Sequence, residues 1–330
     1  MPKIVRFHKT GDAAVLQFDE LPQPEPGANE VRLKVQALGL NRAEVMFREG
    51  QYLEAPKLPA RLGYEAAGVI DAVGPGVTAF KPGDRVSTVP AFSQNDYGVY
   101  GEEVLAPVHA LAKYPDNLSP EEGASIWMQY ITAWGGIIYH GKLSSGQSVL
   151  ITAASSSVGL AAIELAKAAG ARPIAVTRTS AKKKALLQAG AAEVIASAEE
   201  DLPATVRKYT QGKGAALIFD PIAGPFLETL AKSAARGAQI VVYGWLSLEP
   251  TPFPLEAALN NGLNIRGYTL FEITADPQLR AQSESYIYQQ LQQGKLKPKI
   301  DRRFPFSQIA EAHRYMESNQ QNGKIVVTVP

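Results

Sequence analysis

The chain has no cysteine among its 330 residues. This absence excludes disulfide bonds, thiolate ligands for a metal ion and a cysteine nucleophile. Histidine is also scarce, and the four present fit no metal-ligand spacing: His8, His109, His140 and His313. We therefore expect no bound metal.

Neither sign of charge is in excess. Lys and Arg number 33 against 32 for Asp and Glu, so the net charge is +1. This balance gives no support for binding a phosphate backbone, and we expect no nucleic-acid partner. The first residues, MPKIVRFHKTG, lack the apolar segment of a secretion signal, and no run reaches about 18 apolar residues. We expect a cytoplasmic protein with no membrane partner.

The length favours two domains, or one domain interrupted by another. Residues 31–37 alternate apolar and polar side chains, as in a half-buried strand, and 68–73 and 85–87 also read as strands. Closely spaced Pro-Gly and Gly-Asp pairs between them are typical of a compact barrel.

From Val149 onward the pattern changes to alternating strands and helices, which predicts an α/β fold with a doubly wound parallel sheet. The predicted strands are 148–152, 172–176, 193–196, 215–219, 239–243 and 264–267, with a closing strand at 324–329. The predicted helices are 158–169, 180–189, 202–209, 226–234, 277–293 and 307–319.

A turn of small residues joins the first of these strands to its helix. It contains Ser155, Ser156, Ser157, Val158 and Gly159. Small residues allow a pyrophosphate to approach the backbone, and free N–H groups at a helix start attract anions. The glycine fingerprint G-x-G-x-x-G is incomplete, because Ala154 and Ser156 occupy its first two glycine positions. A plain helix cap by Ser155 or Ser156 is the alternative.

The second strand of this unit ends without an acidic residue. An NAD site usually has Asp or Glu there for the ribose 2′-hydroxyl, whereas Thr177, Arg178 and Lys182 suit the 2′-phosphate of NADPH. The alternative for the run 182–184 is a solvated helix face, which we favour for Lys183 and Lys184.

Several segments together resemble the medium-chain dehydrogenase/reductase superfamily, in its zinc-free quinone oxidoreductase branch. They are 41–44 (NRAE), 48–52 (REGQY), 63–68 (GYEAAG), 73–77 (VGPGV), 80–86 (FKPGDRV), 131–134 (ITAW) and 323–327 (GKIVV). The resemblance covers nearly the whole chain in order.

The resemblance implies a GroES-like β-barrel catalytic domain, residues 1–122 completed by 267–330, with a Rossmann domain inserted at 123–266. It places the active site in the cleft between the domains. It also implies a homodimer joined through the edges of the Rossmann sheets.

The same resemblance bears on zinc. The zinc-dependent relatives hold the metal with Cys, His and Cys, and the corresponding positions here are Asn41, Tyr64 and about Met128. Glu65 alone cannot hold zinc without nitrogen or sulfur partners. We therefore expect chemistry without a metal.

Residue roles follow from the resemblance. Asn41 lines the cleft, and Tyr52 is either a proton donor or a rim aromatic that stacks on the substrate. Tyr64 either donates to a substrate oxygen or fills the former zinc pocket, and we favour filling. Gln129 and Tyr130 are expected substrate contacts. Thr132, Gly244 and Lys324 are expected to contact NADPH beside the turn and the Arg178 segment, although Lys324 could equally be an exposed strand residue.

The expected activity is NADPH-dependent hydride transfer to a small molecule, either a quinone or another activated alkene. One alternative is an enoyl thioester reductase that depends strongly on Tyr52. Another, from a different class, is a non-catalytic structural or RNA-binding protein, which the near-neutral charge does not support.

Overall fold

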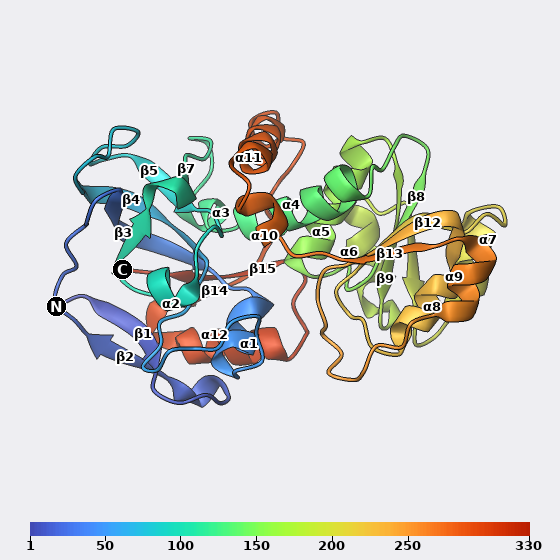
Figure 1. The fold of residues 1–330 in the computed structure, drawn as a ribbon, viewed down its shortest axis with the longest axis horizontal. Helices are drawn as coiled ribbons and strands as arrows, with labels where there is room; N and C mark the ends of the chain where they lie inside the picture. The colour runs from blue at the N-terminus through green and yellow to red at the C-terminus, as the bar shows by residue number, and fades with distance from the viewer. The chain divides into compact units, whose positions relative to one another are not determined.

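The computed structural model describes residues 1–330, and the chain divides into two compact units (Figure 1). Unit 1 comprises Met1–Met128 and Pro298–Pro330, and unit 2 comprises Gln129–Lys297. Unit 2 is therefore an insertion in unit 1. Its second boundary lies after Lys297, not after residue 266 as expected from the sequence.

The segment after residue 266 belongs to unit 2 because its side chains and backbone bond there. The hydroxyl of Tyr268 donates to the carbonyl of Ile131 over 3.3 Å, and the backbone N–H of Lys297 donates to Glu164 over 3.3 Å. Two helices lie between these contacts, α10 (Phe271–Thr274) and α11 (Pro277–Gln292). A helical hydrophobic pattern does not reveal which core a helix packs on, so the sequence placed this segment in the wrong unit.

Unit 2 contains the predicted parallel sheet, with six strands in the order β10-β9-β8-β11-β12-β13. Their bounds are β8 (Ser148–Ile151), β9 (Arg172–Thr177), β10 (Glu193–Ala196), β11 (Ala215–Asp220), β12 (Ala234–Val242) and β13 (Asn264–Gly267). The chain runs outward from β8 to β10 and then returns to the other side of β8. The switch point of the sheet, where such folds bind ligands, is therefore between β8 and β11.

The helices of unit 2 connect these strands. They are α5 (Ser157–Ala168), the short turn η4 (Ser180–Lys182), α6 (Lys183–Gln188), α7 (Leu202–Tyr209), α8 (Phe226–Lys232) and α9 (Leu255–Asn261). A π-helix, η3 (Trp134–His140), precedes the first strand. Leu150, Ile174, Ile218 and Ile240 form part of the apolar core of unit 2.

Unit 1 is built on a mixed sheet in the order β14-β15-β3-β4-β5-β7, with β6 also paired to β3, beside the hairpin β1-β2. The pair β14-β15 is parallel, and the other pairs of this sheet are antiparallel. The bounds are β1 (Lys3–Phe7), β2 (Leu16–Glu20), β3 (Glu30–Gly39), β4 (Glu65–Val73), β5 (Arg85–Thr88), β6 (Glu103–Pro107), β7 (Leu111–Ala112), β14 (Ile300–Pro305) and β15 (Lys324–Thr328). Strand β3 follows the predicted alternation, since Val31, Leu33 and Val35 are buried and Lys34 is exposed.

Short helices complete unit 1. They are η1 (Ala13–Val15), α1 (Arg42–Arg48), α2 (Gln94–Tyr97), η2 (Val108–Ala110), α3 (Pro120–Gly123), η5 (Phe306–Gln308) and α12 (Ile309–Glu317). The helix α4 (Trp127–Ala133) begins at the end of the first segment of unit 1. None of the helices combines the length and the apolar composition needed to cross a membrane.

Candidate active site

The turn after β8 presents unpaired backbone donors. Ser156 is the N-cap of α5, because the N–H of Gly159 donates to its Oγ over 3.0 Å. The capping interpretation is therefore confirmed for Ser156. It does not exclude anion binding, since the N–H groups of Ser157 and Val158 have no acceptor in the chain.

Gly159 holds the turn against the helix. A Cβ at this position would lie 2.6 Å from the Cα of Ala154 and 2.7 Å from the carbonyl oxygen of Ala153. No side chain fits there without moving the backbone. Ala153 itself has a φ of +45°, which tightens the turn without a glycine.

A buried carboxyl lies below this turn, at the end of β11. Asp220 accepts hydrogen bonds from the hydroxyl of Thr152 and, over 2.7 Å, from the N–H of Ala223. Burial raises the pKa of Asp220 above its ordinary value, while these bonds oppose the shift. Asp220 joins the ends of β8 and β11 at the switch point, a role that its position in the sequence did not reveal.

Gly244 follows β12 and packs on the neighbouring strand end. A Cβ there would lie 3.1 Å from the carbonyl oxygen of Pro221. The close packing against Pro221 is enough to explain why a glycine occupies this position. The expected contact of Gly244 with the cofactor stays a prediction.

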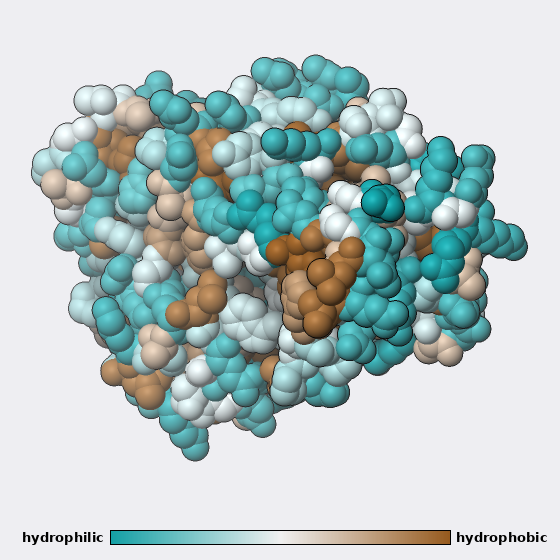
Figure 2. Space-filling model, turned by 45° about the vertical axis from the view of Figure 1, so that its right-hand side comes forward, coloured by the Kyte–Doolittle hydropathy of each residue, from teal (hydrophilic) through white to brown (hydrophobic).

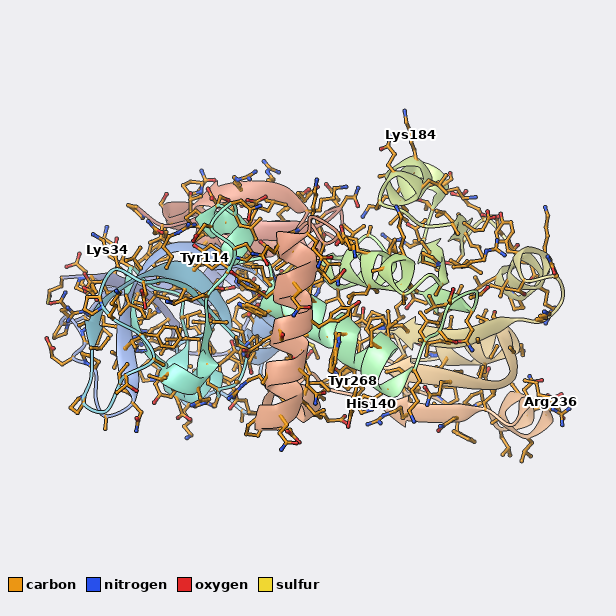
Figure 3. All side chains as sticks on the ribbon, turned by 90° about the horizontal axis from the view of Figure 1, so that it is seen from above. Lys34, Tyr114, His140, Lys184, Arg236 and Tyr268 are labelled. Carbon is orange, nitrogen blue, oxygen red and sulfur yellow. The ribbon has the colours of Figure 1, made fainter.

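The segment after β9 brings together the residues expected at a 2′-phosphate. Thr177 is buried at the strand end, Arg178 is exposed, and the guanidinium of Arg178 has no partner in the chain. The ammonium of Lys182 donates to Ser155 Oγ over 3.0 Å, which links this segment to the turn. Lys184 is exposed as predicted (Figure 3), but Lys183 instead donates to Glu200 over 2.6 Å.

A hydrogen-bonded group connects α4 with α5. Tyr130 is buried, and its hydroxyl donates to Glu164 over 2.7 Å. Gln129 and Thr132 are also buried. Their expected contacts with substrate and cofactor stay predictions. Glu164 was not predicted, because an isolated glutamate in an Ala-rich helix carries no local signal.

Glu164 should make the stability of the protein depend on pH near neutrality. Burial raises the pKa of its carboxyl to about 7 from 4.5, against the opposing effect of Tyr130, Lys297 and Lys167. The folded state thus binds this proton more tightly than the unfolded state, so its stabilisation is complete at low pH and is lost as the pH rises through about 7. Relative to Glu164→Gln, the unfolding free energy should fall by up to about 3 kcal/mol across that window. Chemical denaturation at several pH values measures this, and identical pH profiles would contradict it.

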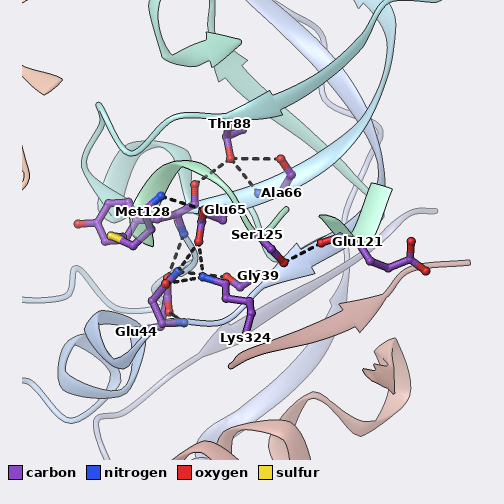
Figure 4. Close-up of polar contacts among 11 residues, drawn as sticks. Gly39, Glu44, Glu65, Ala66, Thr88, Glu121, Ser125, Met128 and Lys324 are labelled. Atoms are coloured by element: carbon purple, nitrogen blue, oxygen red, sulfur yellow. Dashed lines mark hydrogen bonds and ion pairs between the residues drawn. The ribbon is translucent and has the colours of Figure 1, made fainter. Parts of the chain in front are cut away.

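In unit 1, four polar side chains form a buried cluster around Glu65 (Figure 4). The ammonium of Lys324 donates to Glu65 and, over 2.6 Å, to Asn41 Oδ1. Asn41 Nδ2 donates to Glu65 over 3.1 Å, and the backbone N–H of Asn41 donates to Glu44 over 2.5 Å. We call Asn41, Glu44, Glu65 and Lys324 the Glu65 cluster.

The Glu65 cluster changes two expectations. Lys324 is 1% exposed, so the alternative of an exposed strand residue is wrong. Its contact with cofactor phosphates stays a prediction, and its ammonium already has two oxygen partners. Asn41 Nδ2 has three oxygen neighbours, from Gly39, Glu44 and Glu65, so a bond to substrate would require an exchange of partners.

The cluster also contains an unusual carboxyl. Burial raises the pKa of Glu44 to about 8, although Lys324 and Asn41 oppose the shift. The backbone N–H of Tyr64 donates to Glu44 over 3.2 Å, and that of Met128 donates to Glu65 over 2.9 Å. All three positions that correspond to zinc ligands in the resemblance, 41, 64 and 128, are therefore bonded to carboxylates of the cluster. These residues do not fit zinc, and no group of three His, Cys, Asp or Glu is arranged to hold a metal.

Aromatic side chains lie next to this cluster. Tyr64 is 1% exposed, and its ring centroid lies 6.3 Å from Tyr52 and 5.7 Å from Phe92. Tyr52 is partly exposed. Burial raises the pKa of both phenols, so each is protonated at neutral pH. The expected roles of Tyr64, as a residue that fills the former zinc pocket, and of Tyr52 both stay predictions.

Comparisons with known proteins cover the whole chain. Residues 27–116 match the alcohol dehydrogenase GroES-like domain, and residues 157–282 match the zinc-binding dehydrogenase domain. The chain is 33% identical to a human quinone oxidoreductase over 328 residues, which covers 98% of this chain and 97% of the relative.

Solved structures also match this chain over nearly its whole length. Escherichia coli quinone oxidoreductase, complexed with NADPH, matches with a TM-score of 0.90 and 27% identity, covering 99% of each chain. The CurK enoyl reductase matches with a TM-score of 0.89 and 26% identity, covering 100% of this chain and 99% of the other.

Proposed function

Because the chain belongs to the quinone oxidoreductase branch of the medium-chain dehydrogenase/reductase family, we propose that it is an NADPH-dependent oxidoreductase that reduces a quinone or another activated alkene without zinc. The observation that carries the proposal is the pair of unpaired N–H donors at Ser157 and Val158, close in sequence to the Lys182–Ser155 bond. That bond brings the turn and the cationic segment of Arg178 together.

The residues of unit 2 suit a phosphorylated dinucleotide. Ser155 to Gly159 would hold the pyrophosphate, and Thr177, Arg178 and Lys182 would hold the 2′-phosphate. Thr132 and Gly244 complete the proposed set. When bound, NADPH supplies a hydride. The contribution of the protein is then to orient the bound NADPH and to exclude competing reactions.

The Glu65 cluster supports a reaction without zinc. Asn41, Tyr64 and Met128 offer neither thiolate nor imidazole, and the ammonium of Lys324 already neutralises Glu65. A divalent cation would have to displace that ammonium from a buried carboxylate. Quinones suit such a site because they are strong electrophiles and need less polarisation than a simple carbonyl.

In unit 1, Tyr52 is the proposed proton donor. Its phenol is protonated at neutral pH and partly exposed, and its ring centroid lies 6.3 Å from that of the buried Tyr64. Asn41 stays a proposed substrate contact of unit 1, and Gln129 and Tyr130 stay proposed substrate contacts of unit 2. Such a donor stabilises the negative charge that develops on a substrate oxygen during the reaction.

A cofactor prediction follows from Arg178, whose guanidinium has no partner in the chain. We expect Arg178→Ala to weaken NADPH binding by roughly 1.5–3 kcal/mol, the usual loss for a charge-assisted hydrogen bond, and to spare NADH. Titration of cofactor fluorescence measures both affinities. Equal weakening of the two cofactors would contradict the assignment.

The activity itself is tested by steady-state assays with a naphthoquinone, an enone and crotonyl-CoA, each with NADPH. We expect turnover of the first two. The similarity to the CurK enoyl reductase, together with Tyr52, makes enoyl thioester reduction the second candidate. Turnover of crotonyl-CoA alone would favour that candidate and reject ours.

A homodimer with a cytoplasmic location completes the proposal. Strand β13 is the edge of the parallel sheet, and unpaired edges invite pairing. Five large hydrophobic side chains between residues 246 and 259 are exposed, a concentration rare on monomers: Leu246, Leu248, Phe253, Leu255 and Leu259. Figure 2 shows one face of the molecule, which is mostly hydrophilic with localised hydrophobic areas. Light scattering tests the dimer.

A further inference from the structure

We propose that Glu199 is a specificity residue that acts as a resident anion beside Arg178, opposing the 2′-phosphate of NADPH and so moderating the preference for NADPH over NADH. The inference rests on the proposed function, because it concerns the same cofactor site. Glu199 follows β10 and carried no signal in the sequence.

The position of Glu199 is fixed by backbone bonds that continue the sheet beyond β10. The N–H of Ser197 donates to the carbonyl of Thr177 over 2.9 Å, and the N–H of Ala198 donates to the carbonyl of Arg178 over 3.0 Å. Residues 197 and 198 therefore run alongside 177 and 178. This pairing brings the next residue, Glu199, to the start of η4.

Glu199 occupies two donors of this segment. Its Oε1 accepts from the backbone N–H of Ser180 over 3.0 Å and from Ser180 Oγ over 3.3 Å. A hydroxyl and an N–H directed at one oxygen are the groups that would otherwise bind a phosphate oxygen. The neighbouring Glu200 forms an ion pair with the ammonium of Lys183 over 2.6 Å.

The guanidinium of Arg178 is exposed and forms no hydrogen bond or ion pair in the chain. No oxygen of Glu199 lies within 4.0 Å of its guanidinium, so the carboxylate takes up donors without neutralising the arginine. An incoming 2′-phosphate would gain Arg178 but would meet a negative charge at Ser180. NADH has no such phosphate and does not meet this repulsion. The end of β9 carries no acidic residue. Glu199, which follows β10, places a carboxylate at Ser180 instead.

Two variants distinguish the effect of the negative charge of Glu199 from the effect of the two Ser180 donors that it occupies. Glu199→Gln keeps an oxygen for Ser180 and removes the charge, whereas Glu199→Ala also frees both Ser180 donors. Glu256→Gln on α9 is the matched control, because Glu256 has no hydrogen bond or ion pair in the chain. All three changes remove one negative charge from unit 2, and thermal unfolding checks that each variant is folded.

The test measures dissociation constants for NADPH, NADH, 2′,5′-ADP and 5′-AMP by titration calorimetry. We expect Glu199→Gln to lower the dissociation constants of NADPH and 2′,5′-ADP by about three- to fivefold, a typical effect of one exposed charge, and Glu199→Ala to lower them at least as much. NADH and 5′-AMP should change less than about twofold, as should all four ligands with Glu256→Gln. The gain should shrink at high salt, which screens exposed charges.

The outcomes distinguish the two proposals. Unchanged or weaker NADPH binding in both Glu199 variants, with intact binding by the original chain, overturns the role of Glu199 and leaves the proposed function standing. Weaker NADH binding with unchanged NADPH binding also overturns it, because Glu199 would then serve the ribose hydroxyl. If neither dinucleotide binds to any form of the protein, the proposed function fails and the inference fails with it.

Discussion

Lys324→Met is expected to lower the free energy of unfolding by about 3–5 kcal/mol, the usual result of removing one partner of a buried ion pair. Lys324 is 1% exposed and bonds to Glu65 and Asn41, so its loss leaves a carboxylate uncompensated in the interior. Chemical denaturation, followed by a probe of secondary structure, measures the change.

The control for this prediction is Lys34→Met. Lys34 is also a strand lysine, but it is exposed on β3 (Figure 3), and surface changes usually stay within about 0.5 kcal/mol. Adding Glu65→Gln to Lys324→Met should recover part of the loss, because it removes the unpaired charge. A loss below about 1 kcal/mol for Lys324→Met would show that the Glu65 cluster does not depend on its ammonium.

Tyr52→Phe is expected to lower kcat/KM for an enone about 100-fold, at the lower end of the usual contribution of a general acid. Hydride addition to an enone leaves an enolate that must be protonated, and Tyr52 is a partly exposed, protonated phenol. A quinone needs less assistance, so its kcat/KM should fall less than about threefold. Steady-state kinetics with both acceptors measures the difference.

Tyr97→Phe is the matched control for Tyr52→Phe. Tyr97 belongs to the same aromatic group through Phe92, but its hydroxyl donates to Glu30 over 2.6 Å. Tyr97→Phe should change kcat/KM for the enone and kcat/KM for the quinone by no more than about twofold. An unchanged enone activity in Tyr52→Phe would instead make Tyr52 a rim aromatic that stacks on the substrate.

The local patterns of the sequence predicted most of the fold. Period-two and helical patterns are short-range properties, and they located β8 to β11, β13 and the helices α5, α7 and α11 within a few residues. Strand β12 begins at Ala234, earlier than the predicted start at residue 239. They did not locate the boundary after Lys297, because helix periodicity does not identify the core on which α11 packs.

The candidate site was only partly predictable. Ser156, Arg178 and Lys182 follow from chemistry local to one turn or one strand end. The Glu65–Lys324 pair joins residues 259 positions apart, and Glu199 reaches Ser180 from a different strand. Such pairings depend on strand order and register, which a single sequence does not specify. Glu164 and Asp220 were missed for the same reason, since their partners lie on other elements.

The central claim is NADPH-dependent hydride transfer to a quinone without a metal. The most direct measurement is a single-turnover reaction of the protein with bound NADPH and a naphthoquinone, after dialysis against a chelator and analysis of metal content. We expect reduced nicotinamide to disappear as hydroquinone forms in equal amount, at a rate that neither the chelator nor added zinc changes. No oxidation of bound NADPH, or activity lost with the chelator and restored by zinc, would contradict the account.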